Sequence, residues 1–412
     1  MAKTIVFCAD GTWNGPGVPD DDNPNATPTN VFKLFLTLSG TDDPGSMRLA
    51  NEQERSNTVD GTLAQVAKYL HGVGDSKNFL VRALGGGLGG GLITRIVRGY
   101  TFVSRNYLPE DRIYLVGFSR GAYTARALAG LISAKGLLPP DVASDDNKED
   151  AYRQGSAVWY EWRKETLESA PDVFHRLQEW AKDLPHFLFD SAASAGLVPA
   201  PIEAVAVWDT VGSYGIPEFN LQQQAIDAFQ FADTKLSDNV HHGRHAVSID
   251  EQRGNFTPTL WNPNPPRIVQ VLFPGDHGDV GGGYPTKQSG LSDCALAWLT
   301  RELTRLGVQI NGPVVAEAAD ALGIGHQGWL TPLWQKLPHG PRKIPECPNL
   351  CLSEAVLLRM AAAGVIANAD AGTRPSVYAP NNIPTYLNGK LAVAGATVVP
   401  LNDPKAGPGR IA

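Results

Sequence analysis

The stretch Ile113 to Ile132 reads IYLVGFSRGAYTARALAGLI, and it decides the fold of the chain. Its first four residues are apolar or aromatic and end at Gly117, which predicts a short buried strand. Gly117 to Gly121 then form the motif G-x-S-x-G around Ser119, after which alanine and leucine recur at helical spacing. A strand, a sharp turn with a serine and a helix, in this order, are typical of a nucleophile elbow.

A physical reason explains why glycine stands at both ends of this motif, at Gly117 and Gly121. A serine on so sharp a turn has a strained backbone, and a Cβ at Gly117 or Gly121 would collide with the neighbouring strand or helix. We therefore interpret Ser119 as a nucleophile rather than as a serine of an ordinary glycine-flanked loop.

Composition and charge limit the classes of protein to consider. With 412 residues, of which 42% are hydrophobic and 19% charged, the chain can bury a large core. Its net charge of -7 and its lack of a lysine or arginine run argue against a nucleic-acid partner. The four cysteines are too few and too scattered for a disulfide framework or a complete zinc site.

The N-terminal segment carries one lysine and then a short apolar run, Ile5 to Ala9, which is too short for a signal peptide or a membrane span. We therefore expect the chain to be cytoplasmic as synthesised, so that any export would need a system that does not use a cleaved signal.

A glycine-rich stretch, Gly85 to Gly91, contains the pattern G-x-G-x-x-G, which is found in dinucleotide-binding proteins. The acidic residue that would meet a ribose should stand at the end of the next strand, but Glu110 and Asp111 precede that strand. We therefore interpret the stretch as a connector, and we expect neither a cofactor nor a metal.

Three polar side chains follow three predicted strands: Ser119, then Asp209 after Ile202 to Trp208, then His277 after Ile268 to Phe273. Parallel strands end at one edge of a sheet, and the chain order Ser, Asp, His is that of α/β hydrolases. We therefore predict an α/β-hydrolase fold, with a mostly parallel central sheet flanked by helices.

The chemistry of these three types of residue is complementary. A serine hydroxyl becomes a good nucleophile when an imidazole takes its proton, and the imidazole needs a carboxylate to fix its tautomer. Asp209 is the favoured acid. Asp279, only two residues from His277, and Asp250, in a polar segment, are the alternative acids. The predicted oxyanion hole consists of the backbone N–H of Arg120 and an N–H from the loop Gly11-Thr12, which follows the predicted strand Thr4 to Ala9.

We predict a single domain over residues 1–412. Residues 140–199 are rich in aromatic and charged residues and predict an inserted helical cap, in which Trp159 and Trp162 either belong to the core or contact an acyl chain. Residues 313–412 predict a helical or irregular extension packed on the core. Asp227 to Val247 predicts a helix, and its three histidines indicate a solvated face rather than a metal site.

Five stretches of the chain resemble the signature blocks of one family: FCADGTWN, YLVGFSRGAYTARALAGLI, VWDTVGSYG, FPGDHGDVGGGY and YAPNNIP. The resemblance covers the chain from Lys3 to about Pro384, and the predicted cap has no match in it. The family is that of the bacterial and fungal α/β hydrolases that include the phospholipase effectors of type VI secretion. The resemblance implies a serine esterase that acts on acyl esters of glycerophospholipids, with Ser119 as nucleophile, Asp209 as acid and His277 as base.

The same resemblance implies a lipid partner, transient contact with a membrane surface and, for a secreted effector, an immunity protein. The chain departs from the family pattern at Asp276 and Gly278. An extra carboxylate beside His277 is expected to favour the charged imidazole and to move the activity optimum to higher pH.

Three other functions are compatible with the sequence. A metal-dependent phosphoesterase could use strand-end aspartates, Asp10, Asp209, Asp276 and Asp279, to hold one or two cations. A binding module could keep the fold without catalysis, and a small-ester or thioester hydrolase could use the same three residues.

Overall fold

The structure is a computed structural model. It describes residues 2–11, 27–46, 52–72, 88–167, 196–211, 235–254, 256–263, 266–311, 319–331, 334–336, 338–344, 347, 350–367, 374–380, 397–400 and 409–410.

The strands are β1 (Thr4–Ala9), β2 (Thr41–Asp42), β3 (Glu52–Val59), β4 (Thr62–Leu70), β5 (Arg112–Phe118), β6 (Ile202–Trp208), β7 (Val240–Ser248), β8 (Ile268–Phe273), β9 (Leu350–Ser353), β10 (Thr397–Val399) and β11 (Gly409–Arg410). The helices are α1 (Asn30–Thr37), α3 (Leu88–Asn106), α4 (Arg120–Lys135), α5 (Lys148–Leu167), α7 (His277–Gly281), α8 (Gly290–Arg305) and α9 (Glu354–Ala361).

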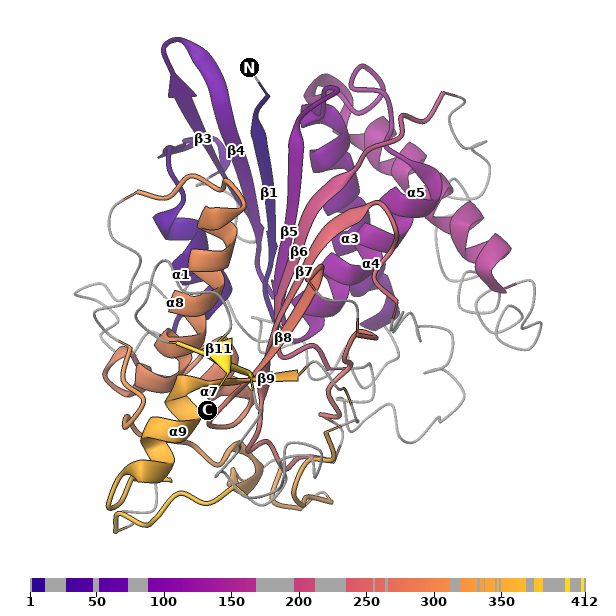
Figure 1. The fold of residues 1–412 in the computed structure, drawn as a ribbon. Coiled ribbons are helices and arrows are strands. Elements are labelled where there is room, and N and C mark those ends of the chain that lie inside the picture. Colours follow the sequence, from indigo (N-terminus) through magenta and orange to yellow (C-terminus); the bar gives the residue numbers. More distant parts are fainter. Residues whose placement is uncertain are drawn as a thin grey trace.

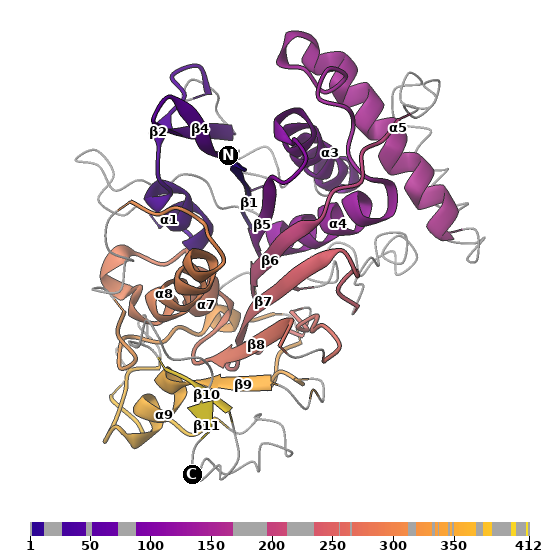
Figure 2. The same ribbon diagram turned by 45° about the horizontal axis from the view of Figure 1, so that its top comes forward.

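The described strands form one 11-stranded sheet in the order β11-β10-β9-β8-β7-β6-β5-β1-β4-β3-β2. Pairing is parallel from β4 through β1 and β5 to β10, and it is antiparallel only where β2, β3 and β11 join the edges. Helices α3, α4 and α5 lie on one face of the sheet, and α1, α8 and α9 lie on the other (Figures 1 and 2). The predicted α/β fold, with a mostly parallel sheet between helices, is confirmed.

The central strands are apolar on both faces because helices cover both faces. In β1, Ile5 and Phe7 belong to the hydrophobic cluster beneath α3 and α4, whereas Val6 and Cys8 belong to the cluster beneath α1 and α8. Each strand residue thus points to the face opposite to its neighbour's, as the pleat of a strand requires. This double burial fixes the strand ends at which the polar residues of the site stand.

Two predicted segments have a different structure. The segment predicted as a helix, Asp227 to Val247, contains β7 in its described part, so this prediction was wrong. The segment is enclosed on both sides by β6 and β8, which supply the hydrogen bonds of a strand. The C-terminal extension also differs, because β9, β10 and β11 join the sheet instead of only packing on it.

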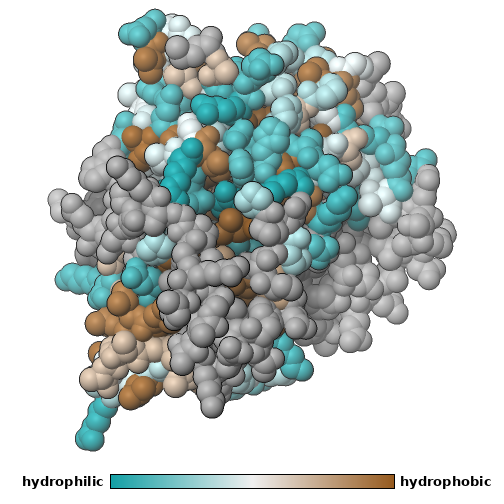
Figure 3. Space-filling view, in the orientation of Figure 1, coloured by the Kyte–Doolittle hydropathy of each residue, from teal (hydrophilic) through white to brown (hydrophobic). Residues whose placement is uncertain are grey.

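The described part of the predicted cap is mainly α5, which packs against α3 and α4. Residues 168–195 of the cap lie outside the described residues, so the cap remains a prediction. Among the described residues that Figure 3 draws in colour, hydrophilic residues prevail in the upper half of the view, and hydrophobic residues gather at the lower left. None of the described helices is both long enough and apolar enough to cross a membrane.

Candidate active site

Ser119 stands between β5 and α4 in the geometry of a nucleophile elbow. Its backbone has φ 56° and ψ -121°, a region that side chains with a Cβ rarely adopt. A Cβ on Gly117 would overlap the backbone of Gly121, and a Cβ on Gly121 would overlap the backbone of Ala9 in β1. The glycines therefore allow the tight packing of α4 against β5 and β1 that holds Ser119 in this conformation.

His277 is the first residue of α7, which follows β8. Asp276 caps this short helix by accepting hydrogen bonds from the backbone N–H groups of Gly278 and Asp279. The ring of Phe118, which precedes Ser119, lies 4.5 Å from the imidazole of His277, and Gly281 leaves no room for a Cβ against the same ring. Phe118 is therefore a shared neighbour of the predicted nucleophile and the predicted base.

Asp209 follows β6 with a strained φ of 37°, and its carboxylate is fully buried. Oδ2 lies 2.6 Å from Nδ1 of His277, while Oδ1 accepts the N–H of Ser248 at 2.9 Å. Arg342 donates to both carboxylate oxygens, at 2.7 and 2.9 Å. Burial alone would raise the pKa of Asp209, but the charge of Arg342 and the hydrogen bonds outweigh burial and hold this pKa well below its ordinary value.

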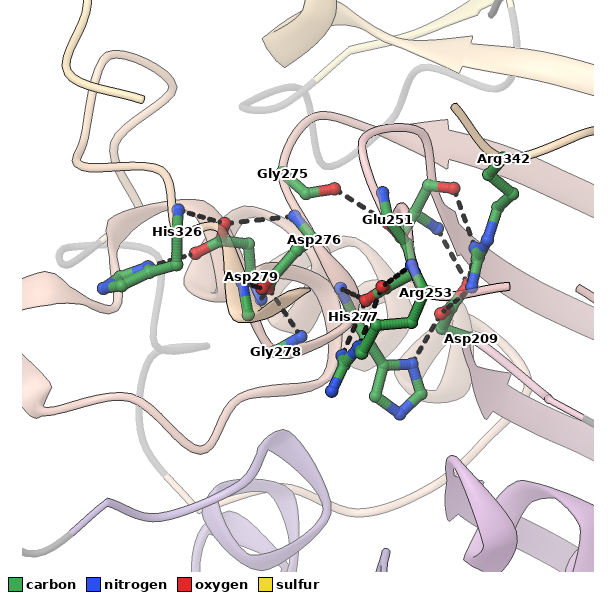
Figure 4. A network of polar contacts seen from close by, with 12 residues as sticks. Asp209, Glu251, Arg253, Gly275, Asp276, His277, Gly278, Asp279, His326 and Arg342 are labelled. Atoms are coloured by element: carbon green, nitrogen blue, oxygen red, sulfur yellow. Dashed lines mark hydrogen bonds and ion pairs between the residues drawn. The ribbon is translucent and has the colours of Figure 1, made fainter. Parts of the chain in front are cut away.

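The other two candidate acids have different partners. The carboxylate of Asp279 lies 2.7 Å from Nδ1 of His326, on the far side of α7 from Asp209 (Figure 4). Asp250 accepts the N–H of Gly275 at 2.6 Å and the hydroxyl of Tyr378 at 2.8 Å. Asp209 is therefore the one of the three whose carboxylate contacts His277.

The expected effect of Asp276 on His277 is not present. The side chain of Asp276 accepts hydrogen bonds from Tyr284 and from the N–H of Gly328, in addition to its capping bonds. Burial, together with the carboxylates of Asp279 and Glu251, raises the pKa of Asp276 to about 7. Burial lowers the pKa of His277 below its ordinary value of 6.5, and Arg253 adds to this effect. The histidine therefore favours its neutral form, contrary to the expectation from the sequence.

Three residues that sequence reasoning missed contact the site directly. Glu251 is fully buried, accepts the N–H of His277 at 3.2 Å and forms a bidentate ion pair with Arg253. Glu251 and Arg253 follow β7, so a correct strand assignment there would have drawn attention to them. Arg342 stands in a loop with no local pattern, and only its tertiary contact with Asp209 identifies it (Figure 4).

The backbone N–H groups of the three predicted oxyanion-hole residues lie in different surroundings where the structure describes them. Arg120 is the first residue of α4, so its N–H belongs to the N-terminal turn of a helix, where backbone N–H groups favour an anion. The N–H of Gly11 donates to Oδ1 of Asp10 at 2.7 Å, so it is already engaged. Thr12 lies outside the described residues.

The two tryptophans predicted as substrate contacts lie in different surroundings. Trp159 is 3% exposed and belongs to the hydrophobic core beneath α3 and α4. Trp162 is partly buried and packs near Gly130 of α4. It lines a cavity of about 680 Å³ together with Trp261 and Arg126. A contact with substrate stays a prediction for both. The cavity beside Trp162 is also lined by Ser133 in the last turns of α4 and by Asn239 just before β7, so it lies toward the sheet edge opposite to the strand ends that carry Asp209 and His277.

The strand-end aspartates of the phosphoesterase alternative are spread over separate partners. Asp10 accepts hydrogen bonds from Thr29 and Tyr69, whereas Asp209 is paired with Arg342, a cation that would compete with a metal ion. Within the described ranges, no three His, Cys, Asp or Glu side chains are grouped so that they could hold a metal ion.

The chain is similar to an uncharacterised protein of Saccharomyces cerevisiae, YEL023C, with 27% identity over 294 residues. This match covers 71% of the chain and 38% of the yeast protein, so the chain spans well under half the length of that relative.

Two solved structures are also similar. One is an uncharacterised protein from Pseudomonas aeruginosa, at 19% identity and a TM-score of 0.42, covering 77% of this chain and 49% of that one. The other is the Tle1 effector bound to the VgrG spike from the type VI secretion system, at 17% identity and a TM-score of 0.35, covering 70% and 52%.

The family model that matches describes the catalytic domain of Tle1-like phospholipase effectors of the type VI secretion system, and it covers residues 3–302 of this chain. These residues include the elbow and the strand ends that carry Asp209 and His277. The chain therefore belongs to the family of Tle1-like phospholipase effector catalytic domains.

Proposed function

We propose that the chain is a serine hydrolase that cleaves acyl esters of phospholipids through an acyl-enzyme. The observation that carries this proposal is the contact of 2.6 Å between His277 and Asp209, which follow strands that end at the same edge of the sheet as β5, the strand before the strained Ser119. Membership of a phospholipase family supports the class of substrate.

In the proposed mechanism, Nδ1–H of His277 donates to Asp209, which leaves the lone pair of Nε2 to act as the base. The Oγ of Ser119 attacks the ester carbonyl while its proton passes to Nε2. The imidazolium then gives this proton to the departing alkoxide, and an acyl ester on Ser119 remains. Water attacks the acyl-enzyme with the same help from His277, which releases the fatty acid and regenerates the serine.

The tetrahedral intermediates carry a negative oxygen that needs hydrogen-bond donors. The N–H of Arg120 is the proposed first donor, because it belongs to the N-terminal turn of α4 directly after the nucleophile. One such donor is worth about 3 kcal/mol of the barrier. Thr12 is the proposed second donor in place of Gly11, whose N–H is engaged with Asp10.

The proposed partners follow from the family. A phospholipid substrate implies transient contact with a membrane or micelle surface, and a secreted effector implies an immunity protein in the producing cell. A hydrophobic side chain that could take part in the surface contact is Leu330, which is 46% exposed. It stands four residues before Trp334, whose ring contacts Phe256, the neighbour of His277.

The test is to label the protein with a fluorophosphonate probe, with and without EDTA, and to compare wild type with Ser119→Ala. We expect labelling of the wild type alone, unaffected by EDTA. Labelling that EDTA abolishes, or labelling that survives Ser119→Ala, would contradict the serine mechanism. A panel of phospholipids with product analysis then identifies the cleaved ester.

A second test separates a lipase from a small-ester or thioester hydrolase. Each CH₂ that is buried contributes about 0.8 kcal/mol, so kcat/KM for p-nitrophenyl esters should rise from acetate to octanoate and palmitate. Trp162→Ala should weaken this preference if the ring lines the acyl site, whereas Trp159→Ala should mainly lower the melting temperature. A flat dependence on chain length in the wild type would favour the small-ester alternative.

A further inference from the structure

Arg342 lies outside the segment that matches the family, yet it is a buried charged residue in contact with the site, at 6% exposed. Its Nη1 donates to Oδ1 of Asp209 at 2.7 Å and to the carbonyl of Ser248 at 2.9 Å, and its Nη2 donates to Oδ2 of Asp209 at 2.9 Å. This is the bidentate arrangement for which the planar guanidinium is suited and the ammonium of lysine is not.

We propose that Arg342 is a positioning residue of the active site, which orients the carboxylate of Asp209 toward His277 and balances its charge. This inference rests on the proposed function, because it assigns Arg342 a role in a Ser-His-Asp mechanism. It also makes the segment 338–344 part of the active site, although the family match ends at residue 302.

The orientation follows from the contacts of the carboxylate. The terminal torsion of an aspartate is broad, so a carboxylate without directional partners can turn away from its histidine. At Asp209, Oδ1 is held by Arg342 and the N–H of Ser248, while Oδ2 is shared by Arg342 and His277. Figure 4 shows Arg342 approaching the carboxylate from the side away from the imidazole. The arginine therefore fixes which oxygen faces Nδ1.

The charge balance follows from the groups around His277. Asp209 after β6 and Glu251 after β7 bring two carboxylates to the histidine, and each has its own arginine, Arg342 and Arg253 respectively. The other acidic groups near His277 are Asp276, which caps α7, and Asp279 within α7; they are bonded to Tyr284, His326 and backbone N–H groups. Removing the charge of Arg342 leaves Asp209 uncompensated, which favours the imidazolium and raises the pKa of His277.

A purely structural role would have a different signature. If Arg342 only anchored the segment 338–344 to the core, its loss would lower the melting temperature and leave the pH dependence of catalysis unchanged. The deciding measurement is therefore the pH dependence of a reaction at Ser119, and not stability.

The experiment measures the rate of fluorophosphonate labelling between pH 5 and 9 for wild type, Arg342→Gln and Arg342→Lys. We expect Arg342→Gln to react about tenfold to a hundredfold more slowly at pH 7 because the acid is misplaced. The fall of its labelling rate at low pH, which reports the protonation of His277 and is called the acid limb here, should move to higher pH by about one pH unit. Arg342→Lys keeps the positive charge but cannot form the two parallel hydrogen bonds to Asp209. It should therefore react slowly, while its acid limb stays close to that of the wild type.

The matched control is Arg244→Gln. Arg244 is 7% exposed and is paired with Glu302 at 2.7 Å, but it stands in β7 and has no contact with Asp209 or His277 among the described hydrogen bonds. Its loss should lower the melting temperature while the labelling rate and the acid limb stay within about twofold of the wild type, as expected for an ion pair outside the site.

Wild-type rate and an unchanged acid limb in Arg342→Gln would overturn the inference and leave the proposed function intact. A wild-type protein that the probe does not label would overturn both. If Arg342→Gln does not fold, Arg342→Lys is combined with Asp209→Asn. A double mutant no slower than Asp209→Asn supports a role through Asp209, whereas an additive loss contradicts it.

Discussion

Two buried histidine–aspartate pairs lie on opposite sides of α7 (Figure 4). In one, Nδ1 of His277 lies 2.6 Å from Asp209, and in the other, Nδ1 of His326 lies 2.7 Å from Asp279. Both histidines are 7% exposed, so neither distance nor burial distinguishes the pairs.

The pairs differ in what surrounds the second ring nitrogen and in their place in the sheet. Nε2 of His326 lies 3.0 Å from Oε1 of Gln288, and its ring stacks on Tyr284 with centroids 3.5 Å apart. His277 instead lies against Phe118, the residue directly before Ser119, and against Phe256. A histidine in contact with an aspartate is thus a candidate base only where its other ring nitrogen, Nε2, can accept the proton of a nucleophile. The pair at His326 has the features of a structural support.

The two pairs should differ most in the effect of replacing their histidines by alanine. His277→Ala should lower kcat by about 10⁶, as loss of the base does in other triad enzymes. His326→Ala should change kcat by less than about tenfold per folded molecule, but it should cost about 3 kcal/mol of stability because Asp279 loses a buried partner. Turnover of p-nitrophenyl esters and a denaturant titration of each variant measure the two effects. The reverse pattern would mean that the catalytic pair has been misassigned.

The next difference is in the two acids. Asp209→Asn should lower kcat by about 10⁴, because the amide stabilises the wrong tautomer of His277, whereas Asp279→Asn should cost less than about tenfold. Both substitutions keep the size of the side chain, so the comparison reports on charge and hydrogen bonding. If the two variants exchange their effects, the acid is Asp279, and the site geometry has to be drawn again around His326.

The elbow could be predicted because all its determinants are local. Strand, turn and helix occupy the contiguous stretch 113–132, and the two glycines show in the sequence why the turn is tight. The contact of Asp209 with His277 was also within reach, since parallel strands bring their carboxyl ends to one edge.

The support around the site could not be predicted in the same way. Arg342 meets Asp209 across 133 residues of chain, and His326 meets Asp279 across 47, without any pattern near either residue. The segment of β7 was predicted as a helix, and its histidines do not decide between the two structures, because His241 and His245 share one face in a helix and also in a strand. Only its two parallel neighbours make it a strand.

The pH dependence of catalysis also distinguishes the two pairs, because of the two histidines only His277 should affect kcat/KM when it titrates. The base must be neutral, and burial lowers the pKa of His277 below 6.5, so the neutral form persists to lower pH. Activity should therefore fall as pH falls, with an apparent pKa below 6.5, and His326→Gln should leave this limb in place. A limb above 6.5 in the wild type would favour the expectation from the sequence that Asp276 raises this pKa.

The smallest expected effect concerns the outer partner of the structural pair. Gln288 contacts His326 much as Arg342 contacts Asp209, in that each is the third member of its group. Gln288→Ala removes one neutral hydrogen bond, so it should cost about 1 kcal/mol of stability and leave kcat/KM within about twofold. Chemical denaturation and ester turnover of the same preparation measure both. A clear loss of turnover with Gln288→Ala would show that the pair at His326 acts on the reaction through α7, and the division into a catalytic and a supporting pair would no longer hold.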